Sequence, residues 1–328
     1  MERDHSSIWA RLNRLLVLLA MLPAFFVIAP SVQASMRSEV HIFNTVTMSD
    51  QQLLRGSGGN EAGIAGALKL PEGDNVPAVI LLYGPDGYTF ELQDWADLLN
   101  ERGIATFMVE STNGRLDSRT GLRQLAMIRD AYAALKVLAE HPSIDANRIG
   151  LIGFTDAGQA ALYSGMRRMK DLYGDAEYQF AAISAFYPNC SVQYRDDTDL
   201  TDTPIRIFHG EKDNVHNIEF CRNFVFRAQA EGGDIRLSAY AGAEHAFDLK
   251  NPDQIKEDNR LSLRDCHITE KVKGILLNAD TGRMFRMNNN CVRSDGRWAY
   301  NETAAELVKI ELSMFLEQAF SGTLAQNN

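Results

Sequence analysis

Apolar segments of two kinds alternate along most of the chain. Segments typical of buried or half-buried strands are short and end sharply at glycine, proline or polar residues. Segments typical of amphipathic helices repeat apolar residues every three or four positions. The predicted strands occupy residues 64–70, 78–83, 104–109, 148–153, 180–186, 205–208 and 235–240. The predicted helices occupy residues 95–99, 122–138, 218–230 and 304–320.

This alternation predicts an α/β fold with a mostly parallel central sheet, right-handed crossovers and helices on both faces. Residues 64–70 alternate only loosely and break at Pro71-Glu72-Gly73, which predicts an edge strand followed by a turn. No internal repeat, low-complexity tract or interdomain linker interrupts the pattern. We therefore expect residues 35–328 to form a single domain.

The first 34 residues have the pattern of a cleaved export signal. Three arginines precede an uncharged apolar run over residues 15–29, and Val32-Gln33-Ala34 then fits a signal-peptidase site. An uncleaved anchor is the alternative, because the uncharged stretch is nearly long enough to span a bilayer. Pro23 and Pro30 weigh against that anchor. The pattern predicts a periplasmic or secreted protein that leaves the membrane once the signal is removed.

Residues 251–301 break the alternation between the last predicted strand and the last predicted helix. The segment is polar, yet it contains Cys266, Cys291 and Trp298. Loops of this length are usually functional covers or disordered. The two cysteines favour an ordered, disulfide-bonded insertion beside the active site, and an outward decoration is the alternative.

All four cysteines follow the export signal. An even number in an exported chain favours disulfides, and pairing of nearest neighbours would join Cys190 to Cys221 and Cys266 to Cys291. A zinc site is the competing interpretation, but the cysteines are widely spaced and include no C-x-x-C pair. The formal net charge of −10 leaves no electrostatic basis for a nucleic-acid partner.

The chemistry is concentrated in the segment 148–158, RIGLIGFTDAG. An apolar strand ends at Gly153, the chain turns sharply, and a helix of small residues begins. This is the layout of the nucleophile elbow G-x-S-x-G, which holds a serine above the edge of a sheet. Here Thr155 stands at the nucleophile position, and Ala157 replaces the last glycine of the motif.

Two further residues complete a candidate triad in the order nucleophile, acid, base. Asp213 follows the predicted strand 205–208, and His245 follows the strand 235–240. Both therefore lie at carboxyl ends of strands, where open α/β sheets place their active sites. An imidazole can take the proton of a hydroxyl nucleophile, and a carboxylate can orient that imidazole. Glu211 competes for the role of acid and His216 for the role of base.

These residues resemble the dienelactone hydrolase family of the α/β-hydrolase superfamily. The resemblance extends over about 64–247 and returns in the last helix. It is carried by GALKLPEG at 66–73, PAVILLYG at 77–84, DAYAAL at 130–135, IDANRIG at 144–150, the elbow, HGEKD at 209–213 and HAFD at 245–248. The resemblance implies an α/β-hydrolase fold and hydrolysis of carboxylic esters or lactones through a cysteine or serine. It implies no metal and no organic cofactor.

The chain departs from that family at the nucleophile and at the oxyanion hole. The methyl group of Thr155 restricts its side-chain rotation and adds strain at an elbow. The oxyanion donors are expected to be the backbone N–H of Asp156 and that of Asp86 or Gly87. The two acidic side chains would oppose an oxyanion. Asp156 is itself an alternative nucleophile, although it lies one position past the apex.

Two functions therefore remain open at this point. The first is a hydrolase of small esters or lactones, with Thr155 as nucleophile, His245 as base and Asp213 as orienting acid. The second is a catalytically impaired descendant that keeps the fold as a binding or scaffold protein.

Overall fold

The computed structural model describes residues 36–83, 89–111, 124–250 and 260–324. Contacts group Ser35–Asn328 into one compact unit. The expected export signal, the oxyanion candidates Asp86 and Gly87, and the first part of the expected insertion, 251–259, lie outside the described residues.

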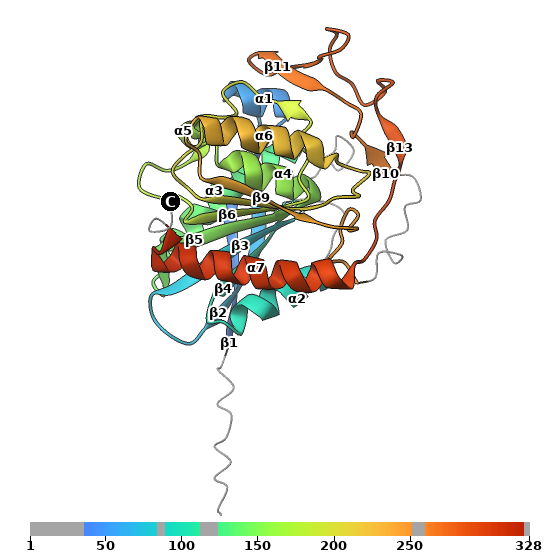
Figure 1. Cartoon of the computed structure of the whole chain (residues 1–328). Coiled ribbons are helices and arrows are strands. Elements are labelled where there is room, and N and C mark those ends of the chain that lie inside the picture. The colour runs from blue at the N-terminus through green and yellow to red at the C-terminus, as the bar shows by residue number, and fades with distance from the viewer. Residues whose placement is uncertain (1–35, 84–88, 112–123, 251–259, 325–328) are drawn as a thin grey trace, which may run out of the picture. The chain divides into compact units, whose positions relative to one another are not determined.

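A mixed eight-stranded sheet forms the centre of the described residues (Figure 1), in the order β1-β2-β4-β3-β5-β6-β8-β9. Pairing is antiparallel between β1 and β2 and between β2 and β4, and parallel between the other neighbours. The strands are β1 (Met36–Thr47), β2 (Asn60–Pro71), β3 (Val76–Tyr83), β4 (Ala105–Glu110), β5 (Ile144–Phe154), β6 (Ala182–Phe186), β8 (Ile205–Gly210) and β9 (Ile235–Tyr240).

Helices cover both faces of this sheet. Helices α2 (Thr89–Asn100) and α7 (Glu302–Ser321) lie on one face, where their apolar side chains share a core with β3 and β5. The opposite face carries α1 (Asp50–Arg55), the short 3₁₀ helix η1 (Gln124–Ala126), α3 (Met127–Ala139), α4 (Thr155–Ser164), α5 (Arg167–Tyr173) and α6 (Ile218–Ala230). The predicted α/β architecture is confirmed.

One predicted element is wrong in its position. The segment 64–70 lies within β2, which pairs with β1 on one side and β4 on the other, so it is not an edge strand. On this side of the sheet the edge strand is β1, where the alternation of apolar and polar residues is inverted over residues 39–42. Val40 and Ile42 are exposed, whereas Glu39 and His41 are half-buried. The polar residues on its inner side hide this strand from a hydrophobicity pattern.

The expected insertion forms two small sheets of its own. Strands β10 (Arg260–Ser262) and β13 (Arg293–Gly296) pair antiparallel. Strands β11 (Ile268–Val272) and β12 (Ile275–Asn278) form a hairpin. The hairpin joins the body of the protein because β11 pairs in parallel with β7 (Val192–Gln193).

Disulfides close both regions that contain cysteines. Cys190 is bonded to Cys221 and Cys266 to Cys291, which are the pairs that the sequence favours. The first bond ties the loop after β6 to α6, and the second closes the insertion around its hairpin. Their α-carbons are 5.0 Å apart in each pair, a separation that disulfides commonly span.

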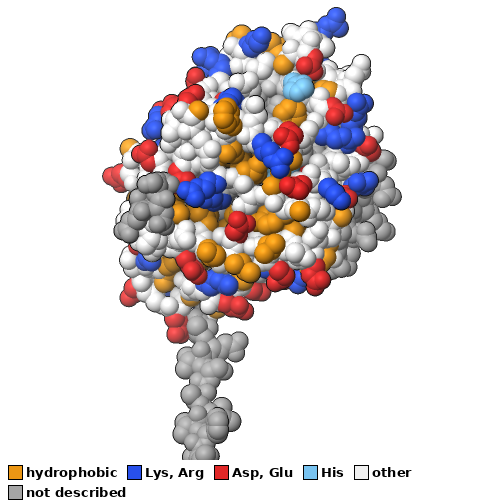
Figure 2. Space-filling model, viewed as in Figure 1, with side chains coloured by type: hydrophobic (Ala, Val, Ile, Leu, Met, Phe, Trp, Pro, Cys, Tyr) orange, Lys and Arg blue, Asp and Glu red, His pale blue; other side chains and the backbone are white. Residues whose placement is uncertain are grey.

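The surface mixes acidic, basic and apolar side chains. Figure 2 shows hydrophobic side chains scattered among charged ones over the face that carries α7. On α7 itself, Leu307, Ile310 and Met314 are exposed. Within the described residues, no helix combines the length and apolarity needed to cross a membrane.

Removing the bond inside the insertion should weaken the fold. Opening a loop of this size should lower the free energy of unfolding by about 2–4 kcal/mol, because the unfolded chain regains conformational freedom. The measurement is urea unfolding of the double variant Cys266→Ala/Cys291→Ala. Peptide mapping of the oxidised wild type should recover the two stated pairs, and any other pairing would contradict this account.

Candidate active site

The elbow forms where β5 runs directly into α4. Phe154 is the last extended residue, with φ −122° and ψ 139°, and Thr155 begins the helix. The backbone of Thr155 is left-handed, with φ 50°. A β-branched residue rarely adopts this conformation, which costs on the order of 1–3 kcal/mol and persists only where the surroundings impose it.

Two glycines permit this tight turn, because they let neighbouring backbone segments approach closely. A β-carbon added to Gly153 would lie 2.1 Å from the carbonyl oxygen of Ala157. A β-carbon on Gly158 would lie 2.5 Å from the carbonyl oxygen of Phe186 on the neighbouring strand. Both positions therefore require glycine. Ala157, which replaces the last glycine of the short motif, is fully buried without such a conflict.

The hydroxyl of Thr155 is directed at its own helix. Its Oγ1 accepts a hydrogen bond from the backbone N–H of Asp156 at 2.5 Å. This is the N–H expected to stabilise an oxyanion. Among the described residues, no hydrogen bond joins Thr155 to His245. Oγ1 would have to leave this hydrogen bond before the Asp156 N–H could bind an oxyanion.

Asp213 and His245 form a buried pair at the ends of neighbouring strands. The Nδ1 of His245 lies 2.7 Å from Oδ2 of Asp213, and both side chains are almost completely buried. The other carboxylate oxygen, Oδ1, accepts hydrogen bonds from the backbone N–H groups of Val215 and His216 at 2.8 and 2.9 Å. The carboxylate thus holds the imidazole with Nδ1 protonated, which leaves Nε2 as the basic nitrogen.

The electrostatics of this pair favour an ionised aspartate. Burial alone would raise the pKa of Asp213, but the charge and hydrogen bond of His245 outweigh it. The pKa of Asp213 therefore lies below its ordinary value. A carboxylate that stays charged at neutral pH can stabilise an imidazolium, as a triad requires.

Sequence reasoning gave His216 only the role of an alternative base, and the structure places it against His245 instead. The two imidazole rings are edge to face, with centroids 4.9 Å apart. The Nδ1 of His216 lies 2.9 Å from the carbonyl oxygen of Tyr187. Burial lowers the pKa of His216 to about 3, and the charge of His245 acts in the same direction. His216 is therefore a neutral neighbour that packs against the ring of His245. Glu211 makes no contact with His245 of the kind that Asp213 makes.

Tyr187 links the elbow to the histidine. Its ring lies 4.7 Å from that of His245 and 6.4 Å from that of Phe154, measured between centroids. Its hydroxyl donates to Asp248 at 2.9 Å, and the other oxygen of Asp248 accepts from Trp95 at 2.9 Å. Tyr187 itself is left-handed, with φ 38°. Sequence reasoning missed this residue, because nothing in its local pattern distinguishes it from a core aromatic.

The end of the insertion covers the same histidine. The ring of Trp298 lies 5.5 Å from that of His245, and the N–H of Ala299 donates to the carbonyl of His245 at 3.2 Å. The guanidinium of Arg260 lies over the Trp298 ring at 3.3 Å. A cation over an indole face is attracted by the ring electrons. Arg260 from β10 and Trp298 after β13 thus form a stacked layer above the imidazole.

The insertion also holds the loop that follows Asp213. Asn214 donates through its side chain to the carbonyl of Asp295 at 3.0 Å and accepts from the N–H of Arg297 at 2.8 Å. The Ser262 hydroxyl donates to the Asn214 carbonyl at 2.7 Å. Residues 260–298 therefore pack on both the acid loop and the histidine loop.

A cavity of about 610 Å³ opens between the first turns of α4 and this insertion. Asp156, next to the elbow residue, is one of its walls. The remaining walls are Asp50, Gln159, Asn189, Val192, Tyr194, Leu263, Ile268, Leu276, Phe285, Arg286 and Met287. The volume is typical of small-molecule sites, and the position is one residue from the candidate nucleophile.

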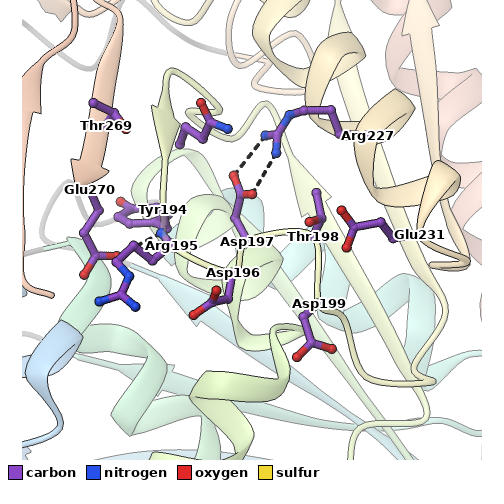
Figure 3. A pocket seen from close by; sticks show the side chains of 11 residues that line it. Tyr194, Arg195, Asp196, Asp197, Thr198, Asp199, Arg227, Glu231, Thr269 and Glu270 are labelled. Atoms are coloured by element: carbon purple, nitrogen blue, oxygen red, sulfur yellow. Dashed lines mark hydrogen bonds and ion pairs between the residues drawn. The ribbon is translucent and has the colours of Figure 1, made fainter. Parts of the chain in front are cut away.

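A second cavity, of about 620 Å³, lies on the other side of Tyr194 (Figure 3). Its walls are mostly charged. Asp197 accepts from both terminal nitrogens of Arg227, at 2.8 and 2.9 Å. Glu270 likewise pairs with Arg168. Neither the three triad candidates nor Asp156 line this cavity.

One group of described side chains, at the edge strand β1, has the spacing of a cation site. It consists of Glu39, His41 and His141. However, the N–H of Ser143 donates to Nδ1 of His141, which fixes the proton on Nε2. That nitrogen then donates to Glu39 at 3.3 Å and has no lone pair for a metal. Hydrogen bonds from the two histidines to the carboxylate of Glu39 therefore explain why these three side chains lie together.

A left-handed strand-to-helix elbow, with an aspartate and a histidine at the ends of later parallel strands, defines an α/β-hydrolase. The chain belongs to the dienelactone hydrolase family, whose profile matches residues 64–265. It is 26% identical over 187 residues to a Bradyrhizobium sp. protein named "Probable 2-oxo-3-(5-oxofuran-2-ylidene)propanoate lactonase", a match that covers 52% of this chain and 73% of that protein.

Solved structures show the same fold. A dienelactone hydrolase-like promiscuous phosphotriesterase from metagenomic libraries has a TM-score of 0.55 and 14% identity, over 86% of this chain and 98% of that one. A candidate dienelactone hydrolase from Klebsiella pneumoniae has a TM-score of 0.53 and 14% identity, over 85% of this chain and 99% of that one.

The buried state of His216 predicts a dependence of stability on pH. Its pKa is lowered to about 3 in the folded protein, whereas an unfolded histidine titrates near about 6.5. Below about pH 6.5 the unfolded chain binds a proton that the folded protein resists, so stability falls as the pH falls towards about 3. His216→Asn keeps an N–H donor for Tyr187 and should reduce the loss of Tm between about pH 6.5 and 4.

The exposed His267 provides the matched control, and His267→Asn should leave the pH dependence of Tm unchanged. Part of the slope should remain in His216→Asn, because burial also lowers the pKa of His209. Identical slopes in the wild type and His216→Asn would contradict the assignment of His216 as a buried neutral histidine.

Proposed function

We propose that this protein hydrolyses carboxylic esters or lactones through a triad of Thr155, His245 and Asp213. The observation that carries the proposal is the buried hydrogen bond between Asp213 and His245. It occurs at the ends of β8 and β9, in the same fold as the left-handed elbow at Thr155. The named lactonase relative supports a lactone or simple ester as the substrate class.

In the proposed reaction, Nε2 of His245 takes the proton of the Thr155 hydroxyl as Oγ1 bonds to the ester carbonyl carbon. The carbonyl oxygen becomes an oxyanion, which the N–H of Asp156 stabilises together with an N–H of Asp86 or Gly87. The imidazolium then returns its proton to the departing alkoxide, which leaves an acyl-threonine. Water, deprotonated by His245, hydrolyses this ester and restores the hydroxyl.

Each step uses side chains or backbone groups of this chain alone, so the proposal requires no metal and no organic cofactor. Two disulfides and the pattern of the first 34 residues support an exported protein that works in an oxidising compartment. The packing of residues 260–298 on both catalytic loops supports a role for the insertion as a cover of the site.

A catalytically impaired binding protein is the second candidate. The observation that favours it is the hydrogen bond from the Asp156 N–H to Thr155 Oγ1. In this bond the candidate oxyanion donor and the candidate nucleophile satisfy each other, so neither is available to a substrate. The extra methyl group of threonine also opposes rotation at the elbow. A serine at this position would turn more freely.

Covalent labelling by a fluorophosphonate probe distinguishes the two functions. The hydrolase is supported by labelling of Thr155 in the wild type, abolished in His245→Gln because the base is lost. Labelling that appears only in Thr155→Ser supports the impaired protein. Thr203→Ser changes another buried threonine, one that bonds to Phe180, and should not alter labelling.

The orienting acid gives a second prediction. Asp213→Asn should lower kcat for an activated ester by roughly 10³- to 10⁴-fold, because the amide favours the wrong tautomer of His245. Asp197→Asn changes a buried aspartate that pairs with Arg227 and should leave kcat close to the wild-type value. Steady-state hydrolysis of p-nitrophenyl acetate measures both variants. An unchanged kcat in Asp213→Asn would rule out this triad.

A further inference from the structure

The cavity beside Asp156 has two kinds of wall. The buried wall comes from α4 and the loop after β6 and carries polar side chains, among them Gln159 and Asn189. The facing wall comes from the insertion and is mostly apolar. Its members are Leu263, Ile268, Leu276, Phe285, Arg286 and Met287. A ligand that fills this space would therefore be an apolar body with a polar group on one side.

The polar wall contains hydrogen-bonding groups that lack partners. Gln159 is 1% exposed and Asn189 is 2% exposed. Among the described residues, neither Oε1 of Gln159 nor Nδ2 of Asn189 has a hydrogen-bond partner. Such buried atoms cost about 1–3 kcal/mol when nothing satisfies them. A bound molecule that contacts these two atoms would satisfy them.

Their chemistry specifies the missing group. Gln159 donates through Nε2 to the hydroxyl of Tyr194 at 3.0 Å, so its Oε1 needs a donor. Nδ2 of Asn189 needs an acceptor, because the other end of that amide already accepts from the N–H of Ser191. A hydroxyl both donates and accepts, and it would satisfy the glutamine in either orientation of the amide.

The charges around the cavity disfavour a carboxylate. Asp50 and Asp156 line it, and Arg286 is the cation among its lining residues. Arg286 is exposed, whereas both aspartates are half-buried. A carboxylate offers no donor to Gln159 and would be repelled by the two acids. An uncharged ligand avoids both penalties.

We propose that this cavity binds the acyl part of an uncharged ester that carries a hydroxyl group on an aryl or alkyl body. The assignment of the bound group as an acyl part rests on the proposed function, since the cavity begins one residue from Thr155. Gln159 and Asn189 recognise the hydroxyl, and the insertion supplies the apolar surface. The insertion thereby determines specificity.

Ketones test this pocket without any turnover. The probes are 4-(4-hydroxyphenyl)butan-2-one, 4-phenylbutan-2-one and 4-(3-oxobutyl)benzoate, and their Kd values are measured by calorimetry on the oxidised wild-type protein. The hydroxyphenyl ketone should bind about tenfold more tightly than the phenyl ketone, because the cavity hydrogen-bonds its hydroxyl. The benzoate should bind more weakly than both.

Gln159→Leu removes the acceptor and should reduce the hydroxyphenyl preference to about one, with the affinity for the phenyl ketone retained. Gln193→Leu is the matched control, since Gln193 is exposed on β7 and lines the other cavity. It should keep the wild-type preference. Tyr194→Phe, which leaves Gln159 without its partner, should also change the ratio and serves if Gln159→Leu does not fold.

Equal binding of the three ketones by the wild type would overturn the proposal. So would a Gln159→Leu variant that folds and keeps the preference. Failure of the proposed function has a different result, in which the ketones are discriminated but no ester is hydrolysed. Hydrolysis of esters without discrimination among the ketones would overturn the proposed pocket and leave the proposed hydrolase function standing.

Discussion

The buried hydrogen bond between Asp213 and His245 constrains the part of the molecule where the chemistry is concentrated. A carboxylate taken out of water is costly unless hydrogen bonds and charge compensate it. Here the compensation comes from the His245 ring and from the backbone N–H groups of Val215 and His216. These contacts hold the loops after β8 and β9 together. The insertion packs on both of these loops.

Much of the fold could be predicted because strand and helix patterns are local. Residues 218–230 and 235–240 agree with α6 and β9 at both ends, and the order of catalytic candidates follows from the strands they succeed. The edge strand β1 could not be predicted in this way. Its half-buried residues Glu39 and His41 are polar, whereas the apolar residues between and after them, Val40 and Ile42, are exposed.

The surroundings of His245 could not be predicted from the sequence for a different reason. His216, Tyr187 and Trp298 come from separate loops, and they meet only because the sheet order places β6, β8 and β9 side by side. No spacing in the sequence encodes such contacts. The pattern of 251–301 likewise gave no indication that its hairpin would pair with a two-residue strand, β7.

The elbow explains how a threonine can occupy the apex of this turn. Its geometry depends on Gly153 and Gly158, whose neighbours leave no room for a β-carbon. Thr155 therefore occupies the left-handed position although its side chain is branched. Its Oγ1 accepts from the Asp156 N–H, and a nucleophilic role would require the hydroxyl to leave this bond.

The acyl-enzyme is the most direct test of this account. The protein is mixed with excess p-nitrophenyl acetate, quenched in acid within the first turnover and digested for mass spectrometry. The account predicts an acetyl group on Thr155 that accumulates before the steady state and disappears as the ester is consumed. Hydrolysis that proceeds with no acetyl group on Thr155, or with the acetyl group on Asp156 or another residue, would contradict it.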